Sequence, residues 1–339
     1  MHKMRELSRF QFSGGAVSRR LVLGATAAVV ASPVLAEECR IGPPEHAQGA
    51  PVWLDMDQVE LDAAYDQSVY APLGGQIRAR FASTSEQVRT RLGAPQRLAY
   101  GPSEFERLDI YRTRRPKAPI FVYFHGGAWL RGSAKDSGFP AEMFVRAGAH
   151  FVVPDFIPIS AANGDLRVMA EQVRRAIAWT YVNAATFDGD PERLYIGGHS
   201  SGGHLCGVAL VTDWKNDFGL AETVVKGGLC ESGMYDLKPV RLSARSKYVK
   251  FTDEIEQAMS PQRHLDLLRA PVVITYGTNE TPEFQRQSRD FAAAVKAAGK
   301  PVELIIAENF NHFEIEESLG NPYGPNGRAV LVLMKLSPA

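Results

Sequence analysis

The pentapeptide Gly198-His199-Ser200-Ser201-Gly202 constrains the fold of this chain more than any other feature of its sequence. It directly follows the apolar run 194–196 and opens a helical stretch over residues 203–211. The glycine-x-serine-x-glycine spacing is typical of a sharp strand-to-helix turn that projects the serine oxygen above a sheet edge. The N-terminus of the following helix favours negative charge there. We therefore predict that Ser200 is a nucleophile, whereas Ser201 does not fit the spacing.

Short apolar runs alternate with helical patterns along most of the chain. The runs that predict strands are residues 108–111, 120–124, 151–153, 194–196, 224–229, 271–276 and 302–306. The patterns that predict helices between them are residues 166–182, 203–211 and 284–298. This alternation predicts an α/β fold with a mostly parallel, doubly wound sheet and helices on both faces. Residues 236–262 break the alternation and are expected to form a small helical cap over the site.

The segment that precedes the first predicted strand has a different character. Residues 37–96 contain two predicted short helices, at 54–65 and 83–92, among irregular stretches rich in glycine and proline. We interpret this segment as an N-terminal arm that lies over the main domain and contributes to the cap. The catalytic domain is expected to span residues 97–339.

A glycine pair follows the predicted strand at 120–124, in His125-Gly126-Gly127-Ala128-Trp129. Acyl transfer develops negative charge on a carbonyl oxygen, and fixed backbone amides must stabilise that charge. We predict that the amides of Gly126, Gly127 and Ser201 form this oxyanion hole. His125 is expected to be structural. Trp129 fits a pocket wall or the core equally well, and His199 is a second candidate for the substrate pocket.

Three histidines follow the serine, and their positions separate their roles. His204 lies one helical turn beyond Ser200 and fits local packing, while His264 is expected near a helix start. His312 follows the last predicted strand, at the sheet edge where Ser200 is expected, so it is predicted to be the base.

The acid is expected on the loop after the penultimate strand, residues 276–283, where it would orient the histidine. Glu280 is the favoured residue on this loop. Glu283 remains the alternative, although it suits the first turn of the next helix.

The composition excludes several other classes of function. Lysine plus arginine equals aspartate plus glutamate, 38 each, so the formal net charge is zero and nucleic acid is not an expected partner. The three cysteines, Cys39, Cys206 and Cys230, lack the spacing of a metal site, and no metal is expected. Cys206 and Cys230 are interpreted as buried small apolar residues, with a disulfide between them as the alternative.

The N-terminus has the pattern of an export signal. Basic residues and the pair Arg19-Arg20 precede an uncharged stretch at 21–35, and small residues precede Glu37. Paired arginines before a short apolar core are typical of a twin-arginine signal. The core, about 15 residues, is too short to span a bilayer comfortably, so no stable membrane insertion is expected. We expect the twin-arginine machinery to export the precursor, residues 1–36 to be removed, and the mature protein to be periplasmic or secreted.

Over residues 97–335 the chain resembles the kynurenine formamidase (arylformamidase) branch of the α/β-hydrolases, which adjoins the hormone-sensitive-lipase-like carboxylesterases. The motifs that carry the resemblance are residues 125–129, 198–205, 232–237, 280–288 and 311–315. It implies an α/β-hydrolase fold and a triad of Ser200, Glu280 and His312, without metal or cofactor. The chain differs in having Glu280 where the family usually has aspartate and Ala128 where it usually has an aromatic residue.

The export leader is a third difference, because the formamidases of tryptophan breakdown act inside cells. We therefore expect a small-molecule substrate that is a carboxylic ester, cleaved through an acyl-enzyme. An aryl amide resembling N-formylkynurenine is the second expectation.

Overall fold

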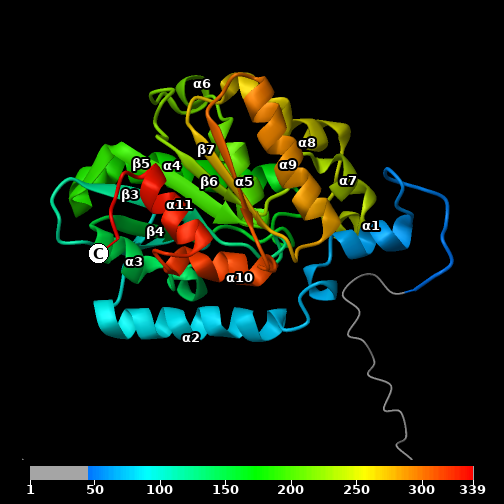
Figure 1. Cartoon of the computed structure of the whole chain (residues 1–339). Helices are drawn as coiled ribbons and strands as arrows, with labels where there is room; N and C mark the ends of the chain where they lie inside the picture. Colours follow the sequence, from blue (N-terminus) through cyan, green and yellow to red (C-terminus); the bar gives the residue numbers. More distant parts are fainter. Residues whose placement is uncertain (1–44, 339) are drawn as a thin grey trace, which may run out of the picture. The chain divides into compact units, whose positions relative to one another are not determined.

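One mixed sheet forms the centre of the computed structural model, which describes residues 45–338; the predicted leader at residues 1–36 lies outside them. Its strands are β1 (Gln96–Ala99), β2 (Arg107–Tyr111), β3 (Ala118–Phe124), β4 (His150–Pro154), β5 (Gly189–His199), β6 (Gly228–Glu231), β7 (Val272–Gly277) and β8 (Val302–Ala307). Their order across the sheet is β1-β2-β4-β3-β5-β6-β7-β8 (Figure 1).

The strands from β4 to β8 in this order all pair in parallel, while β1 pairs antiparallel with β2, and β2 pairs antiparallel with β4. This confirms the expected mostly parallel sheet. Because parallel strands end at the same edge, the loops after β3, β5, β7 and β8 lie along one side of the sheet. All the predicted site residues are on or next to those loops.

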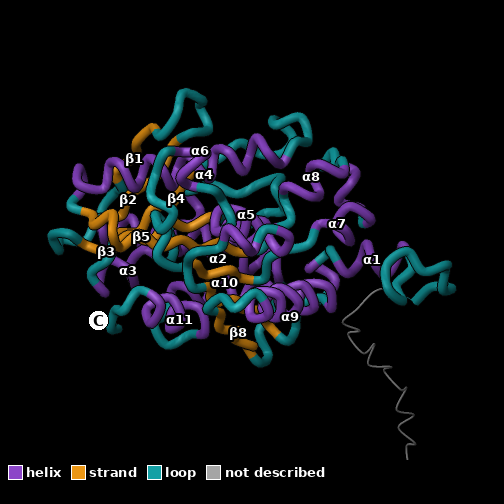
Figure 2. Tube along the Cα trace, turned by 90° about the horizontal axis from the view of Figure 1, so that it is seen from above, coloured by secondary structure: helices purple, strands orange, loops and turns teal. Residues whose placement is uncertain are grey.

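Helices cover both faces of the sheet. They are α1 (Gln58–Ala64), α2 (Gly74–Leu92), α3 (Ala141–Ala147), α4 (Leu166–Asn183), α5 (Ser201–Leu210), α6 (Trp214–Phe218), α7 (Leu237–Leu242), α8 (Asp253–Ala258), α9 (Pro282–Ala297), α10 (His312–Glu317) and α11 (Pro325–Leu333). They flank the strands on both sides when the molecule is viewed from above (Figure 2).

The side chains of β3 show why two layers of helices are needed. Ile120, Val122 and Phe124 belong to one buried cluster, shared with α4, α5 and α9. Phe121 and Tyr123 belong to another, shared with α3 and α11. Successive side chains of a strand point to opposite faces, so a strand that is apolar throughout must be covered on both. The expected doubly wound arrangement is therefore confirmed.

The structure corrects one expected strand and agrees with the helical character of the expected cap. The strand expected at 224–229 is wrong over its first part, because the Val224 amide bonds to the carbonyl of Ala221 in a turn. Pairing to both neighbouring strands begins only at Gly228, which lies opposite Ile196 and Val272. The expected cap at 236–262 is helical, with α7 and α8 separated by a 3-10 turn at Ala244–Lys247.

The two cysteines of the described region are free and buried. The Sγ atoms of Cys206 in α5 and Cys230 in β6 lie 3.8 Å apart, too far for a disulfide bond. The interpretation as small apolar core residues is confirmed. In the same part of the chain, none of the helices combines the length and apolarity needed to cross a membrane.

Candidate active site

Ser200 lies in the turn between β5 and α5. Its φ of 57° and ψ of −119° are a conformation that residues other than glycine rarely adopt. The turn is fixed because the Ser200 amide donates to the Glu231 carbonyl at 2.8 Å, and the Ser200 carbonyl accepts from the His204 amide at 3.0 Å. Strained backbone held in this way is common at functional sites. The predicted nucleophile thus occupies the expected sharp strand-to-helix turn.

The two glycines of the pentapeptide are required by close backbone contacts. A Cβ on Gly198 would overlap the carbonyl of Gly202, and one on Gly202 would overlap the carbonyl of Phe124 at the end of β3. Both overlaps involve backbone atoms, which cannot rotate away as a side chain can. The spacing that was read from the sequence therefore has a direct steric cause.

The loop after β3 packs against the serine turn. A Cβ on Gly126 would lie 3.2 Å from the Ser200 Cβ and 3.1 Å from Nδ1 of His199. Gly127 has a φ of 119°, and its carbonyl accepts hydrogen bonds from two residues further along the loop. Within residues 45–338, the amides of Gly126 and Gly127 donate no hydrogen bond. They can therefore donate to an oxygen atom placed beside Ser200.

His312 and Glu280 are brought into contact from different loops. His312 begins α10 shortly after β8, and its Nδ1 lies 2.7 Å from Oε2 of Glu280, in the loop between β7 and α9. The other oxygen of Glu280 accepts from the Gly277 amide at 2.7 Å and from Oγ of Ser232 at 2.6 Å. Both side chains are buried. A carboxylate at Nδ1 leaves Nε2 as the nitrogen that can accept a proton.

Glu283, the alternative acid, is engaged elsewhere. Its oxygens accept from Nε and Nη2 of Arg286 at 2.7 and 2.8 Å, and from the Tyr65 hydroxyl at 3.1 Å. It opens α9 as a first-turn acid, as its position in the sequence suggested. The structure therefore pairs His312 with Glu280 and leaves Glu283 in a separate network.

Burial shapes the protonation of this pair. Desolvation is the main reason that the pKa of His312 falls to about 4, so the imidazole is neutral at pH 7. Burial by itself would raise the pKa of Glu280, but contact with His312 and the hydrogen bonds from Gly277 and Ser232 hold it below its ordinary value. A neutral imidazole next to a charged carboxylate is the protonation state that a general base needs.

The sequence did not predict a second imidazole–carboxylate contact beside the first. Nδ1 of His199 lies 2.9 Å from Oε2 of Glu316, and the His199 ring packs on the His312 ring with centroids 4.3 Å apart. Glu316 is four residues after His312 in α10, so the two side chains share a helix face. That spacing was the one available signal for Glu316, and nothing in the sequence indicated Ser232.

The remaining aromatic candidates lie in the protein interior. Trp129 is 2% exposed, belongs to the main core, and donates through Nε1 to Nδ1 of His204 at 3.3 Å. Of the two positions that the sequence allowed for Trp129, a pocket wall or the core, the structure shows the core. His125 packs flat on Phe156 with ring centroids 4.4 Å apart. His199 is equally buried, at 2% exposure, against Glu316 and His312.

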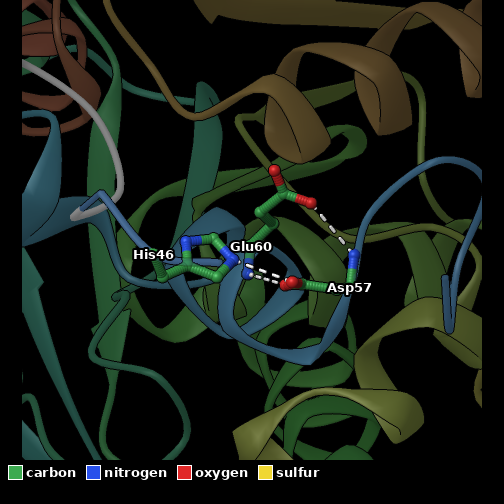
Figure 3. A group of neighbouring side chains, drawn as sticks. All are labelled: His46, Asp57 and Glu60. Carbon is green, nitrogen blue, oxygen red and sulfur yellow. Dashed lines mark hydrogen bonds and ion pairs between the residues drawn. The ribbon is translucent and has the colours of Figure 1, made fainter. Parts of the chain in front are cut away.

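His46, Asp57 and Glu60 form the one group in the described residues with the ligand types and spacing for a metal ion (Figure 3). His46 Nε2 lies 2.8 Å from Asp57 Oδ2, which also accepts from the Gly49 amide at 2.7 Å. Asp57 and Glu60 each accept from the other's amide at 3.0 Å, which is the reciprocal cap that begins α1. Helix capping therefore accounts for the closeness of Asp57 and Glu60 without a metal ion.

Comparisons with known proteins place this chain in a family. A family model described as BD-FAE matches residues 108–232, which include β3, β5 and the serine turn. Kynurenine formamidase from Danio rerio is 32% identical over 79% of this chain and 93% of its own length. The esterase LipQ of Mycobacterium tuberculosis is 29% identical over 60% of this chain and 52% of its own length.

Solved structures show the same fold. A protein from a Silicibacter species matches with a TM-score of 0.71 and 23% identity, covering 81% of this chain and 99% of that one. An esterase from Thermogutta terrifontis matches with a TM-score of 0.59 and 21% identity, covering 73% and 97%. The sheet order, the serine turn and the formamidase relationship together show that this chain is a hydrolase of the kynurenine formamidase-like branch of the α/β-hydrolase superfamily.

Proposed function

We propose that the chain is an exported carboxylesterase that works through an acyl-enzyme. Ser200 attacks the ester carbonyl, and Nε2 of His312 accepts the serine proton and returns it to the leaving alcohol. Water, activated by the same imidazole, then releases the acid and restores the serine. Glu280 holds the imidazole in the required tautomer and stabilises its protonated form.

The observation that carries this proposal is the 2.7 Å contact between His312 Nδ1 and Glu280 Oε2. The two residues come from loops after β8 and β7, at the sheet edge where β5 delivers Ser200 in its strained turn. The order of serine, acid and histidine along the chain is the order of this fold.

The oxyanion hole is proposed to consist of the amides of Gly126, Gly127 and Ser201. A Cβ on Gly126 would lie 3.2 Å from the Ser200 Cβ, which is tighter than most contacts that a side chain makes. Ser201 is the first residue of α5, so its amide has no partner within the helix. The serine side of the site is also nearly dry, since Ser200 is 6% exposed, and this strengthens each hydrogen bond to a developing negative charge.

A second candidate function, an arylformamidase, is favoured by the relationship to kynurenine formamidase over 79% of the chain. The same three residues would serve, because a formamide is cleaved by the same acyl transfer, with an aryl amine as the leaving group. The two candidates differ in the leaving group, which is an alcohol in the ester and an aryl amine in the formamide.

A direct comparison of substrates separates them. The mature protein, residues 37–339, is assayed with p-nitrophenyl acetate and with N-formylkynurenine, with Ser200→Ala as the blank. We expect the higher kcat/KM for the ester. A strong preference for the formamide would reverse this order. If Ser200→Ala kept both activities, both candidates would be contradicted.

Export rests on the leader and is tested separately. The full chain is expressed in a bacterium with an active twin-arginine pathway, alongside the variant Arg19→Lys with Arg20→Lys. We expect esterase activity in the periplasmic fraction or medium for the natural leader and in the cytoplasm for the variant. The same cytoplasmic location for both would contradict export by this route.

A further inference from the structure

His199 is buried beside both the proposed nucleophile and the proposed base. It precedes Ser200 in the chain, and its ring packs on that of His312 with centroids 4.3 Å apart and planes inclined by 48°. It also lies under the oxyanion loop, because its Nδ1 is 3.1 Å from the Cβ position of Gly126. A charge on this ring would therefore act on the base and on the oxyanion region together.

The carboxylate of Glu316 lies next to Nδ1 of the His199 ring. Nδ1 and Oε2 lie 2.9 Å apart, which is an ion-pair distance, although the two groups lack the alignment of a hydrogen bond. The second oxygen of Glu316 accepts from the Tyr123 hydroxyl of β3 at 3.0 Å. Glu316 is 7% exposed, so it is nearly as buried as its partner.

Ionisable groups from several elements surround this pair. They are Tyr123 from β3, His125 from the loop after β3, Glu231 from β6, Glu280 from the loop after β7, His312 from α10 and Arg78 from α2. Burial, and then the negative charge of Glu316, raises the pKa of Glu231 well above its ordinary value. The carboxylates in direct contact with His199 and His312 are Glu316 and Glu280.

These carboxylates raise the pKa of both imidazoles, but the net shifts of the two rings are opposite. Burial by itself would lower the pKa of His199, but Glu316 and then Glu280 hold it above its ordinary value. For His312, burial and then the positive charge of His199 lower the pKa to about 4, and Glu280 only partly opposes them. Of the two imidazoles, His199 is thus the one that holds its proton to the higher pH, and His312 is neutral at pH 7.

We propose that His199 and Glu316 form a second, permanently charged imidazolium–carboxylate pair that tunes His312 as the base. This inference rests on the proposed function, because it assigns the pair a role through the triad. His199 and Glu316 are positioning residues, since they act on His312 and not on the substrate. The pair keeps His312 unprotonated in mildly acidic surroundings, and it makes protonated His312 a stronger acid toward the leaving group.

The test is the pH dependence of kcat/KM for p-nitrophenyl acetate. In the wild type, activity is lost as His312 gains a proton, so the acid limb should lie well below pH 6.5. In the double variant His199→Gln with Glu316→Gln, no charge opposes protonation of His312. We expect its acid limb to move up by about one unit, from about 4 to about 5. Its kcat/KM at pH 4 should then be about a tenth of its own value at pH 8, whereas the wild type should keep about half.

Glu317→Gln is the matched control, because Glu317 is the next residue of α10 but points outward to Arg80 at 2.7 Å. Its acid limb should match that of the wild type. An acid limb that stays in place in the folded double variant would overturn the inference, as would an equal loss of kcat/KM at every pH. Neither result would affect the proposed triad. Labelling of Ser200 in the wild type by a fluorophosphonate probe tests the triad independently.

A measurement on the wild type keeps the inference testable if the double variant does not fold. Nitrogen-15 NMR of labelled histidines should show one buried imidazolium that keeps its proton to a higher pH than a free histidine does. His204 and His312 should both be protonated only near pH 4, and of their two signals only that of His312 should disappear in His312→Ala. Finding all buried histidines neutral at pH 7 would overturn the proposed pair.

Discussion

At the scale of single residues, His312 connects the rest of the site. Its Nδ1 is taken by Glu280, its ring packs on His199, and Phe284 meets it edge-on with ring centroids 5.0 Å apart. The sequence predicted Ser200, Glu280 and His312 because each follows a recognisable strand. It could not predict His199 as a charged neighbour, since that depends on Glu316 reaching across from α10 in the folded chain.

Replacing Glu280 by glutamine tests the acid. The change keeps the shape but removes the charge that stabilises protonated His312, so kcat should fall by about 10²- to 10⁴-fold. Glu283→Gln is the comparison, because Glu283 is as buried as Glu280 but bonds to Arg286 and Tyr65. It should change kcat only a few-fold while lowering the thermal midpoint. The opposite ranking of kcat for the two variants would move the acid to Glu283.

At the scale of elements, the N-terminal helices bring apolar cover to the base. The predicted helix at 83–92 is in fact α2, which begins at Gly74. Its first turns begin with two glycines, which disfavour a helix, and the spacing of Ile77 and Phe81 was the one apolar signal for the longer helix. Tertiary contacts support it, because Ile77 and Phe81 pack with Phe139 and Phe313. Phe313 is the residue after His312, so α2 braces the start of α10.

β1 was also missed, for a related reason. It is an edge strand whose residues are mostly exposed, so it lacks the apolar run that indicated the central strands. Most of the strands that the sequence did predict are buried throughout, but β8 was predicted as well, although it is an edge strand with mostly half-buried or exposed residues. An apolar run, which residues 302–306 have and β1 lacks, is what made a strand recognisable in the sequence.

Gly74→Ala tests whether α2 supports the site. A Cβ on Gly74 would overlap the Phe313 ring, which lies against His312 with ring centroids 5.4 Å apart. The ring must shift, so we expect kcat to fall several-fold and stability to drop by about 1–3 kcal/mol. Gly75→Ala is the control, because its Cβ would meet no atom closer than 4.0 Å. Equal kinetic effects of the two variants would show that α2 does not support the base.

At the scale of the whole molecule, the sequence was enough to predict the fold and the position of the site, but not the details of either. Alternating apolar runs and helices are enough to predict a parallel sheet, and a parallel sheet places its loops along one edge. The distances within the site could not be predicted, because Ser200, Glu280 and His312 are far apart in the sequence and only the strand order β5-β6-β7-β8 brings their loops to one sheet edge. The loops and short helices of the predicted cap carry no motif that would predict the substrate.

The convergence of these three residues is tested most directly by a fluorophosphonate probe, with the labelled residue located by mass spectrometry. The folded wild-type protein should be labelled once, on Ser200. Ser200→Ala should remain unlabelled, and His312→Ala should react slower by several orders of magnitude, because the base that activates the serine is missing. A label on another residue, or an equal rate of labelling without His312, would contradict the assignment of Ser200 and His312 as nucleophile and base.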